Sequence, residues 1–427
     1  MRLPRFLKKL IPGYEVTDLK EWLTKGFIEV FLKPESDEMA CARCNTKLST
    51  FHGSYSITLQ HLPLFNFKTY LRLKRRKGYC PCCKKVRSES LDFIAAETPH
   101  YTQEYAWWLG RLCEFSTITK AAKFTQTNEM TLWRMDFDRM RRMFQHYRIP
   151  KVTKISVDEV YAQKYRPGFR NQGRDKSFFT VICDLDSRRV IWVSESRSQS
   201  ALDEFYKIIG PERCAEIEVV VGDQHDAYKA STEQFCPNAT FVWDRFHLVQ
   251  TMERAVDETR KELHADLDWD KETKRLTRGK WKYVFLQKAS RRTKEDQQHI
   301  EQVFKNNEKF LKLELIKEKF LTFFDSKDAL EAEITLGDIG MWIKQCGFMT
   351  LKKWHEHLTK GWKTLRNWFK YRVTTSLSEG QNNVIKTLKK KAYGYKNMAY
   401  FKLKILQVCG FLNSNFIDMN FHGLQQK

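Results

Sequence analysis

Two Cys-x-x-Cys pairs constrain the fold of this chain more than any other feature of its sequence. They are Cys41-Ala-Arg-Cys44 and Cys80-Pro-Cys-Cys83. Each pair can form a tight knuckle that presents two thiolates, and four thiolates complete a tetrahedral zinc site. Apolar residues alternate between the pairs, from Ser56 to Tyr79, and this alternation predicts strands. The sequence therefore predicts a zinc ribbon with one structural Zn²⁺ bound by Cys41, Cys44, Cys80 and Cys83.

Two alternatives to zinc are unpaired buried cysteines and a redox pair. Cys82 is spare or could exchange with Cys83, and His52 is a weaker ligand candidate. Eleven cysteines among 427 residues do not form the pattern of a secreted disulfide framework. A reducing, cytoplasmic location is therefore predicted. The six remaining cysteines stand singly among apolar residues and are expected in the core: Cys113, Cys183, Cys214, Cys236, Cys346 and Cys409.

A helix-turn-helix pattern follows over residues 116–135. The turn is expected at residues 125–128, with Asn128 capping the second helix. Thr131 and Arg134 on the second helix are candidate contacts in the DNA major groove. The alternative is an ordinary helical hairpin. The first helix is expected to contain Ile118, Ala121, Ala122 and Phe124, with the small residues at its packing face.

From Lys154 onward the sequence changes to short apolar runs that are typical of strands. A hairpin comes first, and helices and strands then alternate, which is the order of an RNase H-like fold. In that order Asp158 lies on the first strand and Asp223 ends the fourth, and these two strands are neighbours. Strands are expected at residues 155–160, 178–184, 190–193, 217–221 and 240–243, and helices at 201–209 and from Asp226.

Asp158 and Asp223 could share metal ions at the ends of their strands. Two Mg²⁺ or Mn²⁺ ions about 3.5–4 Å apart can activate a water or a 3′-hydroxyl and stabilise the leaving oxygen. Glu159 competes with Asp158 for this role. Asp226 competes with Asp223, although it also fits as the cap of the next helix. The charges of two aspartates alone do not balance the charges of two divalent ions, so a third acidic ligand is expected elsewhere in the sequence.

Glu379 is the candidate for that third ligand, because it is the one acid between Glu356 and Asp418. It falls in the first turn of an expected helix that Ser376 or Ser378 could cap. The alternative is an ordinary acid at a helix N-terminus. One helix face is expected to carry Glu379, Asn383, Lys386 and Lys390. The opposite face is expected to carry Val384, Ile385, Leu388 and Ala392.

The formal charge of +23 and the pI near 9.5 favour a polyanionic partner. No run of 18 apolar residues exists, so no membrane-spanning helix is expected.

Roughly 130 mostly helical residues separate the last strand from Glu379, which predicts an inserted helical subdomain. At its entrance, Asp244 and His247 share a helix face, although a lone histidine is more often structural.

Taken together, these stretches resemble the bacterial insertion-sequence transposases of the ISL-three family along essentially the whole chain. CARC and CPCC match its zinc module, SVDE carries Asp158, and GDQHDAY carries Asp223. DRFH matches the Asp-x-x-His signature of Asp244 and His247. The most specific match is SEGQNNVIK followed by AYGYKN, which carries Glu379. Zinc knuckles and helix-turn-helix patterns are shared more widely.

The resemblance implies a DDE transposase. Asp158, Asp223 and Glu379 would hold two Mg²⁺ or Mn²⁺ ions, and His247, supported by Asp244, would orient or accept a proton at the scissile phosphate. Water would free a 3′-hydroxyl at the element end, and that hydroxyl would attack target DNA. Terminal inverted repeats and target DNA are the expected partners, and cutting two ends together requires a dimer or a larger assembly. The expected DNA contacts are Thr131, Arg134, Asn383, Lys386, Lys390, Arg75 and Arg76.

The expected fold class is multidomain α+β and α/β, with a zinc ribbon, a helix-turn-helix and an RNase H-like catalytic domain interrupted by an all-helical insertion. Three rivals remain: a regulator that binds DNA without catalysis, an RNase H-like nuclease or junction resolvase, and a decayed transposase. The expected boundaries are an N-terminal segment 1–40, a zinc module 41–95, a helix-turn-helix 96–150, catalytic parts 151–247 and 373–427, and the insertion 248–372.

Overall fold

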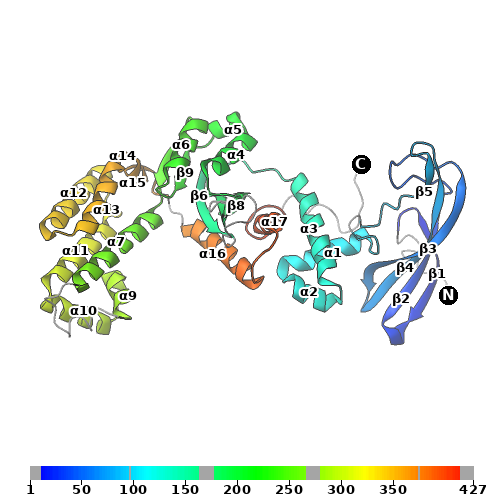
Figure 1. The fold of residues 1–427 in the computed structure, drawn as a ribbon, viewed down its shortest axis with the longest axis horizontal. Coiled ribbons are helices and arrows are strands. Elements are labelled where there is room, and N and C mark those ends of the chain that lie inside the picture. The colour runs from blue at the N-terminus through cyan, green and yellow to red at the C-terminus, as the bar shows by residue number, and fades with distance from the viewer. Residues whose placement is uncertain (1–10, 96–97, 163–176, 266–278, 374–375, 414–427) are drawn as a thin grey trace. The chain divides into compact units, whose positions relative to one another are not determined.

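The chain forms two compact units in a computed structural model that describes residues 11–95, 98–162, 177–265, 279–373 and 376–413 (Figure 1). The first unit comprises Met1–Arg148 together with Ala399–Lys427, and the second comprises Ile149–Met398. The chain therefore leaves the first unit and returns to it. Within the described residues, no helix combines the length and hydropathy needed to cross a membrane.

The first unit begins with a five-stranded sheet in the order β1-β2-β4-β3, with β5 also paired to β4. The long antiparallel hairpin of β3 and β4 lies between the cysteine pairs, so the predicted strands of the zinc module are confirmed. Residues of the expected N-terminal segment 1–40 join the same sheet, because β2 pairs with β4 in parallel. The strands are β1 Tyr14–Trp22, β2 Phe27–Pro34, β3 Phe51–Leu64, β4 Phe67–Cys80 and β5 Lys85–Ser88, and a 3₁₀ turn η2 spans Leu23–Lys25.

Helices α1 Gln103–Phe115, α2 Ile118–Thr125 and α3 Glu129–Gln145 follow the sheet. The Asn128 side chain accepts hydrogen bonds from the first turn of α3, so the predicted cap is confirmed. Ala121 and Ala122 are buried as expected. Phe124 lies on α2 as expected, and its side chain is 75% exposed. The two-helix geometry of the predicted motif is therefore present over residues 118–145.

Helix α17, Met398–Val408, packs against the helices of the first unit through a buried ionic cluster. Asp136 on α3 is fully buried, and its Oδ2 accepts a hydrogen bond from Tyr400 and lies 2.8 Å from Lys404 Nζ. Lys404 also donates to the carbonyl of Cys113 on α1. The segment 373–427, expected as one piece of the catalytic domain, is thus divided, and its last helix belongs to the first unit.

The second unit contains a five-stranded sheet in the order β10-β9-β6-β7-β8. β6, β7 and β8 are antiparallel neighbours, whereas β6, β9 and β10 run parallel. Each strand lies where the sequence predicted it. The strands are β6 Lys154–Tyr161, β7 Phe178–Asp184, β8 Arg189–Ser194, β9 Val219–Gly222 and β10 Thr240–Trp243.

Helices lie on both faces of this sheet, with α16 on one side and α4, α5 and α6 on the other (Figure 1). The three valines of β9 are fully buried, as expected for a strand covered on both faces. The helices are α4 Gln199–Ile209, α5 Pro211–Ala215, α6 Asp226–Phe235 and α16 Ser376–Lys391. The side chains of Ser376 and Ser378, expected as caps of α16, lie outside the described residues.

Between β10 and α16 the described chain is helical. Phenylalanine and tryptophan rings from α11, α13 and α15 pack edge to face in its core, as Phe320 does with Trp354. These elements are α7 Arg245–Ala265, α9 Trp281–Leu286, η4 Ala289–Arg291, α10 Lys294–Asn306, α11 Glu308–Phe323, α12 Ala329–Cys346, α13 Met349–Lys360, α14 Trp362–Leu365 and α15 Asn367–Tyr371.

Gly361 lets this helical part approach the sheet closely. A Cβ atom at Gly361 would lie 1.7 Å from the indole of Trp243, so any larger side chain displaces that ring. His357 stacks on the same indole with ring centroids 5.9 Å apart. Since Trp243 ends β10 and precedes Asp244, the helical part buttresses the strand end that carries the Asp244 and His247 pair.

Candidate active site

The carboxyl ends of three parallel strands bring Asp158, Asp223 and Asp244 to one edge of the second sheet. Asp158 lies on β6 just past the residues that pair with β9, Asp223 follows β9, and Asp244 follows β10. The register pairs Ser156 with Val221, and two further residues along each strand lead to Asp158 and Asp223. The backbone N–H of Asp244 donates to the carbonyl of Gly222, directly before Asp223. Sequence reasoning therefore identified acids that the sheet gathers at one edge.

His247, on the first turn of α7, lies between two of these acids. Its Nε2 atom is 3.6 Å from Asp158 Oδ1 and 3.8 Å from Asp244 Oδ2. Burial by itself would lower the pKa of His247, but the hydrogen bond to Asp158 and the charges of the neighbouring acids raise it above 6.5. Asp244 is buried and accepts from the N–H of Phe246, which fixes the start of α7. The pair of Asp244 and His247 is thus held against Asp158.

Asp223 occupies a less solvated position than an ordinary surface acid. Burial raises the pKa of Asp223, the charges of His247 and His225 lower it, and the charge of Asp158 raises it again. Its Oδ1 atom accepts a hydrogen bond from the N–H of His225. The influence of Asp158 on Asp223 means that the two carboxylates sense each other across the strand ends.

Helix α16 reaches Asp158 through Asn382. The Asn382 side chain is buried and donates a 2.5 Å hydrogen bond to Asp158 Oδ2. Gln381 donates to the carbonyl of Arg188, and Lys389 donates to the carbonyl of Tyr161. These contacts fix α16 across the sheet.

The rotation of α16 differs from the expected one by about one residue. Ile385 is fully buried as predicted, but Val384 is 41% exposed and Asn383 faces solvent. Asn382 was missed because an Asn-Asn pair gives two equivalent candidates about 100° apart on a helix. The usable signal was the spacing from Asn382 to Ile385, which places both residues on one helix face.

Glu379 is half-buried and stands one turn before Asn382. Residues at i and i+3 of a helix are neighbours, with Cβ atoms about 5–6 Å apart. The hydrogen bond from Asn382 to Asp158 therefore brings the first turns of α16, and Glu379 with them, to the edge where the aspartates lie. Lys386 and Lys390 are exposed farther along the helix.

Glu159, the competitor of Asp158, faces the other side of the sheet. Its Oε1 atom accepts a 3.0 Å hydrogen bond from the hydroxyl of Tyr228 on α6, and its Oε2 lies 4.0 Å from Arg197. Burial raises the pKa of Glu159 above its ordinary value. Adjacent strand residues point to opposite faces, so Asp158, and not Glu159, shares a face with α16.

The donor chemistry of the acids fits Mg²⁺ or Mn²⁺, which prefer carboxylate oxygens. Among the described residues of this edge, no three acid or histidine side chains place their ligand atoms all within 4.8 Å of one another. A two-ion site does not need three carboxylates around one ion. A cation would also relieve the repulsion between Asp158 and Asp223. The residues that could hold such ions are Asp158, Asp223 and Glu379.

Four cysteine sulfurs of the first unit all lie within 4.8 Å of one another, and they are those of the predicted zinc site: Cys41, Cys44, Cys80 and Cys83. Cys44 Sγ lies 3.4 Å from Cys80 Sγ and 3.6 Å from Cys83 Sγ. A tetrahedral zinc with bonds of about 2.3 Å requires sulfur separations of this size. Asn45 and Lys84, which each follow a pair, have positive φ angles of 55° and 52°. Matching knuckles therefore present the four thiols.

Hydrogen bonds make the thiols unequal. The Thr46 hydroxyl lowers the pKa of Cys44 to about 6, whereas the hydrogen bond with Cys44 raises the pKa of Cys83 to about 12. Cys82 is exposed and lies outside the cluster. Five of the six cysteines expected in the core are buried, but Cys346 is only partly buried.

Arg75 and Arg76, expected as DNA contacts, use their guanidinium groups inside the first unit. Arg75 donates to the carbonyl of Glu89, and Arg76 binds the carboxylate of buried Glu89. Arg76 also donates to the carbonyls of Ser36 and Glu38. These contacts join β4 to the chain around the zinc knuckles. Arg134 on α3 is exposed and Thr131 is partly exposed, as contact of this helix face with DNA would require.

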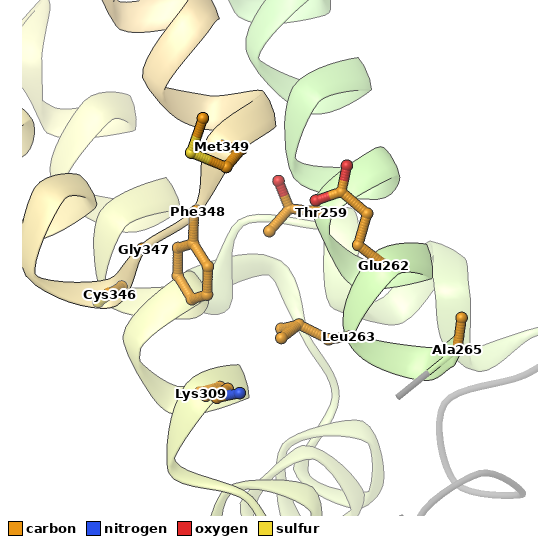
Figure 2. A pocket seen from close by; sticks show the side chains of 9 residues that line it. All are labelled: Thr259, Glu262, Leu263, Ala265, Lys309, Cys346, Gly347, Phe348 and Met349. Carbon is orange, nitrogen blue, oxygen red and sulfur yellow. The ribbon is translucent and has the colours of Figure 1, made fainter. Parts of the chain in front are cut away.

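The helical part of the second unit contains a cavity of about 400 Å³, away from the acids (Figure 2). Leu263 and Phe348 point into it, and Glu262 and Lys309 lie at its edges. Thr259, the cavity residue nearest to His247 along α7, is about 18 Å away at 1.5 Å per residue. The cavity is therefore separate from the edge that carries Asp158 and Asp223.

Comparison with known proteins identifies the family of the chain. Residues 155–405 match the model of the ISL3 (ISL-three) family, described as a transposase. The chain belongs to this transposase family. Residues 37–83 match the zinc finger of the transposases of IS204, IS1001, IS1096 and IS1165, and this range contains all four clustered cysteines. The sequence resemblance is thus confirmed, and so is the zinc ribbon with its Cys₄ cluster.

Two named relatives of this ISL3 transposase are also insertion-sequence transposases. The transposase of IS1001 from Bordetella parapertussis is 24% identical over 379 residues, which cover 88% of this chain and 90% of the relative. The transposase of IS1557 from Mycobacterium tuberculosis is 23% identical over 234 residues, which cover 53% of this chain and 49% of the relative. The first similarity extends across both compact units.

Proposed function

We propose that this chain is an active DDE transposase that binds terminal inverted repeats, cleaves the element ends and joins them to target DNA. The observation that carries the proposal is the hydrogen bond from Asn382 to Asp158. It anchors the helix of Glu379 on the strand of Asp158, beside the strand ends that present Asp223 and Asp244. Four elements, β6, β9, β10 and α16, would thereby contribute acids to one edge.

The second unit has the features of an RNase H-like catalytic domain. Three antiparallel strands followed by two parallel strands, with β6 central beside β9, support this assignment. The helices from α7 to α15 would then be an insertion between the last strand and the helix of Glu379. The catalytic parts would span 151–247 and 373–397, and the insertion 248–372. α17 would belong with the helix-turn-helix.

Asp158, Asp223 and Glu379 would hold two Mg²⁺ or Mn²⁺ ions, which would polarise the scissile phosphate and lower the pKa of bound water. In hydrolysis, water adds to phosphorus, the 3′ oxygen leaves and takes up a proton, and a 3′-hydroxyl results. In strand transfer, that hydroxyl adds to a target phosphate and the target 3′ oxygen leaves. His247 would orient the phosphate or accept a proton at Nε2, and Asp244 would hold its ring.

DNA would be bound by several parts of the chain. Thr131 and Arg134 would contact the terminal repeats from α3, and the zinc ribbon would support that module. Asn383, Lys386 and Lys390 are exposed on α16 and would hold the DNA backbone beside Glu379. Arg75 and Arg76 would act by stabilising the ribbon, because their donors already have protein acceptors. Two ends would be cut within a dimer or larger assembly in the bacterial nucleoid.

The test is cleavage and strand transfer on a labelled duplex that carries the element's own terminal repeat, with Mg²⁺ or Mn²⁺. Replacing Glu379 by Gln removes the charge and keeps the shape. We expect the variant to bind the end normally and to lose both reactions by at least about 100-fold. Glu356→Gln is the matched control, because Glu356 is the next acid upstream and lies exposed on α13. It should retain wild-type activity.

Two results would oppose the proposal. Equal activity of wild type and Glu379→Gln would move the third ligand elsewhere and leave Glu379 as an ordinary helix acid. Tight end binding without cleavage by any variant would favour the alternative, a catalytically inactive DNA-binding regulator derived from a transposase.

Asn382→Ala is expected to weaken catalysis by roughly 10- to 100-fold, because residues that orient metal ligands have effects of this size. It should also raise the Mg²⁺ concentration needed for half-maximal cleavage, which a purely structural role would not do. Thr387→Ala, on an exposed position of the same helix, serves as the control. An unchanged Mg²⁺ requirement with reduced stability would make Asn382 only a packing residue.

A further inference from the structure

Tyr393, two residues after the end of α16, combines a left-handed backbone with a fully exposed aromatic side chain. Its side chain is fully exposed, at 102% of the reference value. Its backbone is left-handed, with φ of 52°. The N–H of Tyr393 donates to the carbonyl of Lys390, and the N–H of Gly394 donates to that of Lys389. Glycine usually occupies this position after a helix, because a Cβ atom is unfavourable in the left-handed region.

The chain around Tyr393 is positively charged. From Gly380 to Ile417 the sequence contains no acidic residue. Lys390, Lys391 and Lys396 are exposed on either side of the tyrosine. An exposed aromatic ring among lysines has the composition of a surface that binds single-stranded nucleic acid, in which bases stack on the ring and lysines hold the backbone.

We propose that Tyr393 stacks on an unpaired nucleobase of the DNA end that α16 holds at the acids. This inference rests on the proposed function and adds a base-binding residue to it. At 1.5 Å per residue, Tyr393 lies about 21 Å from Glu379 along the helix. With one phosphate per 3.4 Å of each strand, this length corresponds to about six nucleotides from the scissile phosphate. The exposed Lys386 and Lys390 between them would follow the backbone over that distance.

The test uses the full-length protein and terminal-repeat duplexes with 2-aminopurine placed singly at each position from about three to nine nucleotides from the cleaved phosphate. Wild type and Tyr393→Phe should change the fluorescence at one position, because stacking on a ring quenches the probe. Tyr393→Ala should lose that change and bind the end about tenfold more weakly. Tyr393→Gly should lose it as well, while its unfolding temperature rises because the left-handed backbone is relaxed.

Three results would overturn the inference. In the first, wild type cleaves the end but no probe position responds to Tyr393. In the second, Tyr393→Ala loses oligomer assembly, measured by light scattering, without any change at a base, which would assign Tyr393 to a second copy of the chain. In the third, wild type neither binds nor cleaves the end, and then the proposed function fails together with the stacking that depends on it.

Discussion

Asp158→Asn should reduce the single-turnover rate of end cleavage by at least about 1,000-fold. Metal-bound carboxylates support several kcal/mol of transition-state stabilisation, and each 1.4 kcal/mol corresponds to a factor of ten. Asparagine keeps the shape, and its one amide oxygen can still accept the hydrogen bond from Asn382, so the fold and end binding should persist. The measurement is cleavage under enzyme excess with a gel-shift assay beside it.

Glu159→Gln provides the matched control, because it removes the neighbouring charge on the same strand. Glu159 faces Tyr228 on the other side of the sheet, and a glutamine oxygen can still accept that hydroxyl. We expect its cleavage rate to stay within about threefold of wild type. If Glu159→Gln is inactive and Asp158→Asn is active, the two residues have exchanged roles and the face assignment of β6 is wrong.

Cys80→Ser should release zinc and unfold the end of the first sheet. Cys80 is fully buried and belongs to the small core of Met39, Cys41 and Leu48. Structural zinc contributes about 10–16 kcal/mol in isolated zinc fingers, so losing one ligand should lower the free energy of unfolding of this unit by several kcal/mol. The measurements are zinc content by elemental analysis and hydrogen exchange of β3, β4 and β5. Exchange in the second unit should not change.

Cys82→Ser is the control for this experiment, because Cys82 lies in the same knuckle, is exposed and stands outside the sulfur cluster. It should retain one zinc per chain and wild-type exchange. If the Cys80→Ser variant binds zinc as well as the wild type does, the assignment of four thiolate ligands is wrong. Loss of zinc in Cys82→Ser alone would mean that Cys82 replaces Cys83 as the ligand.

Much of the second unit could be predicted from sequence, because its strands are short apolar runs with clear ends. The β-branched run of β9 and the apolar runs of β7 and β8 around a turn are typical of strands, and the order of elements then places Asp158 beside Asp223. The zinc ribbon could also be predicted from the sequence, since the spacing of its cysteines indicates two knuckles.

The sequence was less informative where the partner of a side chain is distant in sequence. Val384 belongs to the expected apolar face of α16 but is 41% exposed. Arg75 and Arg76 have the composition of DNA contacts, yet Glu89 and nearby carbonyls bind them. The local sequence pattern gives the hydrophobicity and charge of a residue, but it does not reveal which group contacts that residue in the folded protein.

The sequence by itself determined the elements, the zinc ligands and the family of this chain, because these depend on residue types at short, fixed spacings. Only the tertiary structure decided that Asn382 contacts Asp158, that Glu159 faces away, and that α17 returns to α3 through Asp136 and Lys404. Each of these outcomes depends on how far a helix is rotated, which element covers each face of a strand, or where the chain returns. A rotation of about 100° exchanges adjacent residues on a helix, and only packing against distant segments fixes it.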